Sequence, residues 1–186
     1  LYAFYRCSPR CAAELGFCYG AGLFLTGTYW LYVSIHVFGE APLILAISLM
    51  VALVIIMACY YAATGWLIAR LAGGRPGYFV VLAPAAWVLF EWLRGWFLSG
   101  FPWMTLGYAQ IDSLLAGYAP LLGIFGVSLM LMLSAAAVTM LFAGPPQSRL
   151  ILAAIALATW LGGALLGRVE WTDVAGAPVR ATIVQG

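Results

Sequence analysis

One acid and one base lie inside an otherwise apolar and aromatic stretch of this chain, Phe90-Glu91-Trp92-Leu93-Arg94-Gly95-Trp96-Phe97-Leu98-Ser99-Gly100-Phe101-Pro102-Trp103. A charged side chain near the centre of a bilayer costs about 2.5–3.5 kcal/mol on insertion scales, so an intramembrane charge is expected to be paired or functional. Residues three apart share one face of a helix. The spacing therefore predicts a structural ion pair between Glu91 and Arg94, with direct substrate contact as the alternative. For that alternative the Arg94 guanidinium would suit a phosphate, because it donates two hydrogen bonds at once.

The composition predicts an integral membrane protein. Hydrophobic residues make up 66% of the 186-residue chain and charged residues 8%, whereas a soluble domain typically has roughly 25% charged residues. Five apolar runs approach or exceed the roughly 18 residues that mark a spanning helix; they are residues 15–38, 42–69, 78–98, 117–143 and 150–167. We expect an all-α membrane protein, a polytopic bundle of about five transmembrane helices.

The arginines predict an orientation. The eight basic residues are all arginines, and five of them precede the first run, follow the second, or lie between the fourth and fifth: Arg6, Arg10, Arg70, Arg75 and Arg149. The alternate loops carry Glu40 and Asp112 instead. By the positive-inside rule, the start of the chain is cytoplasmic and the residues after about 168 lie on the opposite side of the membrane.

Several classes of function are not expected. A net charge of +2 without a basic stripe argues against nucleic acid as a partner. Cys7 and Cys11 lack the histidine or second cysteine pair that a metal site needs, and we expect reduced thiols rather than disulfides. Ser99, Thr105 and Ser113 have no adjacent histidine, and Cys59 has no activating neighbour, so the chain alone should not catalyse covalent chemistry. We expect no catalytic residue, metal or cofactor within it.

Two aromatic clusters are expected on the same side of the membrane. One is residues 28–36 and the other is the loop 99–116, which is too apolar for a free loop. Tryptophan and tyrosine favour the headgroup boundary, and irregular backbone at that depth survives only against protein or a wet cavity. The loop is therefore either a simple aromatic belt or the wall of a lipid-binding cleft. The candidate lipid contacts are Trp30, Glu91, Arg94, Phe101, Trp103 and Tyr108.

The last residues differ in character from the rest. Hydrophobic density falls after Arg168, and residues 179–184 alternate in the manner of a β-strand. A single strand cannot pair its backbone alone. We therefore divide the chain into a transmembrane helical domain, 1–168, and a linker with the first strand of a domain that is absent from the chain, 169–186.

Several motifs occur in the order in which they are found in one family of enzymes. They are residues 16–20, 29–35, 91–96, 100–103, 107–112, 119–123 and 184–186. At these positions the sequence resembles apolipoprotein N-acyltransferases, enzymes of the bacterial inner membrane that complete lipoprotein maturation. The resemblance implies eight spans in the family, with a periplasmic nitrilase-like domain before the last. This chain would then supply spans three to seven and the start of that domain.

The resemblance also implies a reaction. In that family a Glu, a Lys and a Cys of the nitrilase-like domain act together. The Cys takes an acyl group from a phospholipid as a thioester and passes it to the amino group of a diacylglyceryl-cysteine on a lipoprotein. This chain contains no lysine, and its four cysteines precede that domain, so none of the three residues can be assigned. We expect the covalent step to occur beyond Gly186, the fragment alone to be inactive, and the membrane part to shape lipid access.

Two other functions remain open from the residues. A non-catalytic membrane anchor or assembly module is the stronger of them. A small transporter is less favoured because it would need polar residues along several spans, and the second and fifth runs offer almost none.

Overall fold

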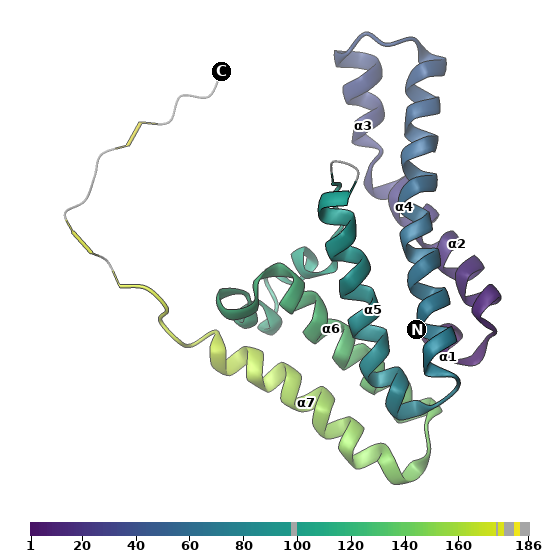
Figure 1. Ribbon diagram of the computed structural model, residues 1–186. Helices are drawn as coiled ribbons and strands as arrows, with labels where there is room; N and C mark the ends of the chain where they lie inside the picture. The colour runs from purple at the N-terminus through teal and green to yellow at the C-terminus, as the bar shows by residue number, and fades with distance from the viewer. Residues whose placement is uncertain (98–99, 174, 177–180, 183–186) are drawn as a thin grey trace.

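The computed structural model describes residues 1–97, 100–173, 175–176 and 181–182, and within these residues the regular structure is helical throughout (Figure 1). The α-helices are α1 (Tyr2–Arg6), α2 (Pro9–Gly27), α3 (Trp30–Tyr32), α4 (Leu43–Ala72), α5 (Pro76–Trp96), α6 (Ala119–Ala143) and α7 (Arg149–Leu166). A π-helix, η1 (Val33–Phe38), continues α3, and three short 3-10 helices, η3 (Leu106–Gln110), η4 (Leu114–Tyr118) and η5 (Pro146–Ser148), lie in the connections.

Four helices are long and apolar enough to cross a membrane, namely α4, α5, α6 with the preceding η4, and α7 with the preceding η5. A fifth span is present if α2 and the segment Trp30–Phe38 count as one. The fold class expected from the composition, an all-α membrane bundle of about five spans, is confirmed.

The first span is not the single straight helix expected over residues 15–38. It begins earlier, at Pro9, and α2 and the segment Trp30–Phe38 differ in direction by 52°. The break falls at Thr28, whose buried hydroxyl donates to the carbonyl oxygen of Phe24 at 2.5 Å. Back-bonding of this kind often bends helices, and a hydropathy pattern does not register it.

Local sequence explains the start of α2, the end of α4 and the start of α5. The Ser8 hydroxyl accepts a hydrogen bond from the backbone N–H of Cys11 at 3.3 Å, and Pro9 opens α2. Gly73 ends α4 in the left-handed region, at φ +53°, which suits glycine. The extended residue Arg75 then leads into Pro76, the first residue of α5.

Small residues bring α2 against α4. A Cβ at Gly16 would overlap the carbonyl oxygen of Tyr61, and a Cβ at Gly65 would overlap that of Ala12. In lipid, helices gain little from hydrophobic association, so close backbone packing of this kind stabilises the pair.

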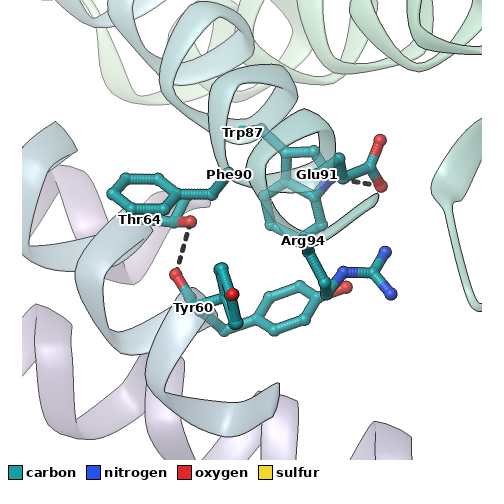
Figure 2. Close-up of a pocket in the computed structure, with 7 residues that line it drawn as sticks. Tyr60, Thr64, Trp87, Phe90, Glu91 and Arg94 are labelled. Atoms are coloured by element: carbon teal, nitrogen blue, oxygen red, sulfur yellow. Dashed lines mark hydrogen bonds between the residues drawn. The ribbon is translucent and has the colours of Figure 1, made fainter. Parts of the chain in front are cut away.

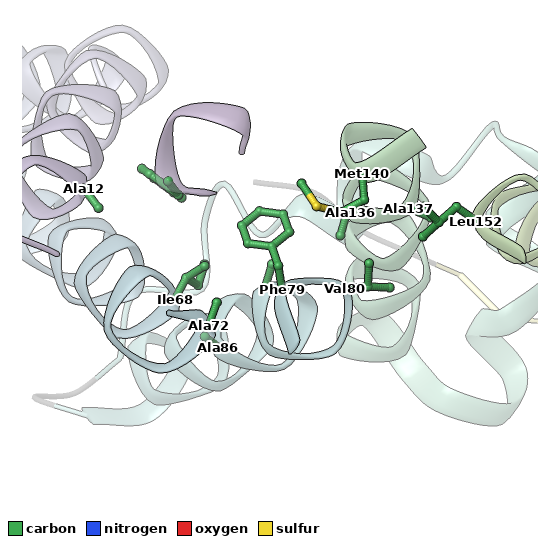
Figure 3. Close-up of a cluster of buried hydrophobic side chains, with 12 residues drawn as sticks. Ala12, Ile68, Ala72, Phe79, Val80, Ala86, Ala136, Ala137, Met140 and Leu152 are labelled. Carbon is green, nitrogen blue, oxygen red and sulfur yellow. The ribbon is translucent and has the colours of Figure 1, made fainter. Parts of the chain in front are cut away.

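The main apolar cluster joins side chains of several helices (Figure 3). Ala72, Phe79, Met140 and Leu152 place it toward the end of the bundle that holds the turn 73–75 and the connection 144–148. We call this the connection end. There Phe79 and Val80 of α5 pack with Met140 of α6, Leu152 of α7 and Ile68 of α4. The opposite end, which we call the loop end, holds the residues that join α5 to α6.

The strand expected over residues 179–184 lies outside the described residues, apart from 181 and 182. The division into two domains at 168 and 169 stays a prediction, with α7 ending at Leu166.

Candidate functional site

The connecting loop, residues 100–118, joins α5 to α6 at the loop end and is fastened to neighbouring helices. The backbone N–H of Gly107 donates to the hydroxyl of Ser128 on α6 at 2.8 Å. The Tyr118 hydroxyl donates to the carbonyl oxygen of Thr159 on α7 at 2.9 Å. This anchoring agrees with the apolar composition, which argued against a free loop.

Arg94, near the end of α5, is 1% exposed and directs its guanidinium into the start of this loop. Its Nη1 donates to the carbonyl oxygens of Phe101, at 2.9 Å, and of Trp103. Its Nη2 donates to the hydroxyl of Thr105 at 3.3 Å. We call residues 100–105 the Arg94 turn, because the cation lies among its acceptors. The Arg94 Cζ also lies 5.3 Å from the centre of the Phe24 ring, which adds a cation–π contact from α2.

The backbone of the Arg94 turn is tightly folded. The N–H of Phe101 donates to the carbonyl oxygen of Arg94 at 2.7 Å, and the Thr105 hydroxyl donates to that of Pro102 at 2.7 Å. Met104 has φ +62°, a left-handed conformation that is uncommon outside glycine. Such backbone costs of order 1–3 kcal/mol and persists only where the surroundings enforce it.

Glu91, one helical turn before Arg94, is 3% exposed and holds the residue that follows the turn. Its Oε1 accepts from the backbone N–H of Leu106 at 2.7 Å and from the indole N–H of Trp87 at 3.1 Å. Its Oε2 is buried without a hydrogen-bond partner among the described residues.

The expected ion pair between Glu91 and Arg94 is not formed. No guanidinium nitrogen of Arg94 lies within 4.0 Å of a carboxylate oxygen of Glu91. Figure 2 shows the carboxylate and the guanidinium pointing to the same side of α5 without meeting. Their shared helical face was correctly predicted. Their partners were not, because backbone carbonyls, an amide and a hydroxyl of the connecting loop fold back onto that face and satisfy each charge separately.

The space beside these two residues is too small for a lipid headgroup. A cavity of about 10 Å³ lies between α4 and α5 (Figure 2), which is about the size that one water occupies. It is lined by Tyr60, Tyr61, Thr64, Trp87, Phe90, Glu91 and Arg94. The Arg94 guanidinium donates to the connecting loop instead, and its contact with a phosphate stays a prediction.

Three of the four aromatic candidates, Trp30, Phe101 and Trp103, meet in one cluster. The rings of Trp30 and Trp103 lie 6.0 Å apart between centroids, and those of Phe101 and Trp103 lie 5.0 Å apart. Trp103 is 50% exposed and Trp30 43% exposed. Phe101 also lies 6.0 Å from Phe24 of α2, so the cluster joins the loop to the first span.

Tyr108 lies on a different surface, an open cleft of about 360 Å³ beside the connecting loop, which we call the loop cleft. The cleft is lined by Tyr19, Leu23, Tyr61, Trp87, Met104, Thr105, Leu106, Tyr108 and Ala109. The structure therefore groups Trp30, Phe101 and Trp103 on one surface and Tyr108 on another.

Two residues that hold the loop were not among the sequence candidates. Thr105 has no neighbour in sequence that marks it as a partner of Arg94. Ser128 was detectable in principle, because it is one of few polar residues in the apolar run 117–143. Neither residue belongs to a pattern that says which backbone group it meets.

Comparison with known proteins adds the family. Residues 1–137 match the family described as "Apolipoprotein N-acyltransferase N-terminal domain". Relatives named apolipoprotein N-acyltransferase include those of Chromobacterium violaceum, 44% identical over 181 residues, and Nitrosomonas europaea, 41% identical over 184 residues. A third, from Azotobacter vinelandii, is 41% identical over 182 residues.

Each of these alignments covers 96% of this chain, but only 35–36% of the relative. The chain thus spans about a third of the length of the curated relatives it matches. With most of its length inside the matched domain, the chain belongs to the apolipoprotein N-acyltransferase family.

Proposed function

We propose that this chain is the membrane part of an apolipoprotein N-acyltransferase and that it shapes the access of lipids to a catalytic domain that follows Gly186. The whole protein would move an acyl chain from a phospholipid, through a cysteine thioester, to the amino group of a lipoprotein's diacylglyceryl-cysteine. The names of the relatives and the family match support the reaction class. The catalytic residues would lie outside this chain.

One observation carries the role of the membrane part: half-exposed tryptophans of two separate segments, Trp30 and Trp103, meet at the loop end. Helix α7 ends at the loop end of the bundle, since Gly163 and Gly167 lie against Gly117, close to the last residue of the connecting loop. A domain entered after α7 would thus begin at the same end of the bundle as the aromatic cluster.

Physical chemistry favours a membrane-embedded lipid contact at this place. Both substrates carry acyl chains, and each CH₂ group moved into water costs about 0.8 kcal/mol. An enzyme that meets its lipids at the headgroup boundary leaves the chains in the bilayer. Tryptophan and tyrosine rings suit that boundary because they are apolar with one polar edge. We assign lipid contact to Trp30, Trp103 and Tyr108, with Phe101 supporting the Trp103 ring from behind.

For localisation we propose the bacterial inner membrane, with residues after about 168 on the periplasmic side. The arginine distribution supports this orientation. The turn that carries Arg75 and the connection before Arg149 lie at the same end of the bundle (Figure 1), as the positive-inside rule requires of two cytoplasmic connections.

The test is acyl-thioester formation by the full-length protein in phospholipid vesicles. Trp103→Ala should lower the rate at least roughly tenfold per folded molecule, because positioning groups can supply large factors in rate. Trp92→Ala is a matched control. Trp92 is also half-exposed, but it packs against Trp96 on α5, with ring centroids 5.3 Å apart. Equal rates for the two variants, with losses only in the amount of folded protein, would favour the non-catalytic anchor instead.

A further inference from the structure

We propose that Glu91 and Arg94 are positioning residues: they touch no lipid themselves, and they fix the Arg94 turn so that the Trp103 ring is presented in one orientation. This inference rests on the proposed function, in which Trp103 is a lipid contact. It gives the two membrane charges a role that neither an ion pair nor a phosphate site explains.

Trp103 combines a fixed backbone with an exposed ring. Its carbonyl oxygen accepts from the buried guanidinium of Arg94. Its side chain is 50% exposed and lies against Trp30. The hydrogen bond to Arg94 therefore fixes the backbone from which the ring projects, and it leaves the ring itself available to a ligand.

The Arg94 turn is held at both ends from one face of α5. Arg94 binds residues 101–105, and Glu91 binds the N–H of Leu106 immediately after them. The two side chains are less than one helical turn apart on α5, so they act on the turn as one rigid support. A guanidinium suits this task, because its planar fork offers several donors in fixed directions, whereas a lysine ammonium is a single point.

A strained residue, Met104, lies between the two anchored parts of the turn. Met104, next to Trp103, has φ +62°. Its side chain packs closely against Gly27 of α2, since a Cβ added to Gly27 would lie only 2.8 Å from the Met104 Sδ. Left-handed backbone at a residue other than glycine relaxes when its surroundings allow it. Loss of the Arg94 bonds should let Met104 relax, which would rotate the neighbouring peptide and move the Trp103 ring.

The kinetic test uses Arg94→Lys in the full-length protein, with thioester formation measured per folded molecule over a range of phospholipid concentration. We expect kcat/KM to fall roughly 10- to 100-fold, the range that a misplacement of about 1 Å can produce. The kcat/KM of Arg94→Met should fall at least as far. If it does not fold, the lysine variant still decides the question, because it keeps the charge and loses the fork.

A double-mutant cycle separates positioning from general damage. If Arg94 acts through Trp103, then Arg94→Lys combined with Trp103→Ala should be no slower than Trp103→Ala alone. Losses that multiply in the double variant would overturn the proposal.

Two variants of Glu91 distinguish loss of the negative charge from loss of the hydrogen-bond acceptor. Glu91→Gln keeps an oxygen that can accept from Leu106 and Trp87, and it alters only Oε2, which has no partner among the described residues. We expect the kcat/KM of Glu91→Gln to remain within about threefold of the wild-type value. The kcat/KM of Glu91→Leu should fall as far as that of Arg94→Lys, since only the leucine leaves the loop amide without its acceptor. Equal losses in both variants would mean that the charge itself matters, which would contradict a positioning role.

A spectroscopic readout keeps this inference separable from the proposed function. In protein labelled with 5-fluorotryptophan, the ¹⁹F resonance of Trp103 can be assigned by its disappearance in Trp103→Phe. Arg94→Lys should shift or broaden that resonance, and Glu91→Gln should leave it in place. An unchanged resonance in Arg94→Lys would overturn the positioning role. A changed resonance together with full activity of Trp103→Ala would instead overturn the proposed function and leave the positioning intact.

Discussion

The two halves of α5 are both buried, but they are buried by different means. Toward the connection end, Phe79, Val80 and Ala83 pack among apolar side chains of the neighbouring helices. Toward the loop end, Glu91 and Arg94 are also buried, yet their contacts are hydrogen bonds to the connecting loop. One helix thus carries a packing half and a loop-holding half.

Because of this difference, the residue type at a position is constrained more strictly in one half of the helix than in the other. Apolar packing is set by volume and shape, so many hydrophobic combinations satisfy it. Hydrogen bonds from a buried charge have fixed donors, acceptors and directions, and removing one partner leaves the other without compensation. We therefore expect substitutions in the packing half to change stability, and substitutions in the loop-holding half to change the shape of the loop.

The largest effect should come from moving a charge into the packing half. Ala83→Arg places a cation where no loop can satisfy it, and we expect it to destabilise the folded protein by about 3 kcal/mol relative to Ala83→Met. The methionine variant controls for side-chain size. The measurement is the free energy of unfolding in mixed detergent micelles. Similar values for the two variants would mean that the packing half tolerates charge as well as the loop-holding half does.

A smaller effect is expected from a cavity in the packing half. Phe79 is fully buried, and Phe79→Ala should cost about 2 kcal/mol of unfolding free energy, less than in a water-soluble core, because lipid is itself apolar. The rate of thioester formation per folded molecule should stay at the wild-type value. A clear change in that rate would show that the two halves are coupled.

The smallest effect should follow Ser128→Ala, which removes the acceptor of the Gly107 N–H on the far side of the loop. One neutral hydrogen bond contributes about 1 kcal/mol. We expect a stability loss of that size, with a modest fall in thioester formation. Ser128→Ala should lower the rate more than Phe79→Ala does, although Ser128→Ala is the less destabilised variant. The opposite order would contradict the distinction between the packing half and the loop-holding half.

Much of this organisation could be predicted from the sequence, because the signals are one-dimensional. Apolar runs of sufficient length indicated the spans, and the shared helical face of Glu91 and Arg94 followed from their spacing. The sequence also predicted that the clusters of Trp30 and Trp103 lie on one side of the membrane, and the contact between the two rings is compatible with that.

The bonding partners could not be predicted in the same way. Spacing tells which residues share a face, but not that the Thr105 hydroxyl and the Leu106 amide fold back onto that face. The left-handed Met104 carries no sequence signal, because methionine does not favour that conformation. The bend after Thr28 was missed for a related reason: it falls within a segment that is apolar on both sides, where the hydropathy pattern carries no sign of a change in direction.

The most direct test of the central claim, that the buried charges of α5 hold the connecting loop, is amide hydrogen exchange of the full-length protein in lipid. The Arg94→Lys variant should exchange residues 100–110 at least roughly tenfold faster than the wild type, since the amides of Phe101 and Leu106 depend on that arrangement. Residues 77–86 of the packing half should exchange at the wild-type rate. Unchanged protection of residues 100–110, or equal loss in both segments, would contradict the account.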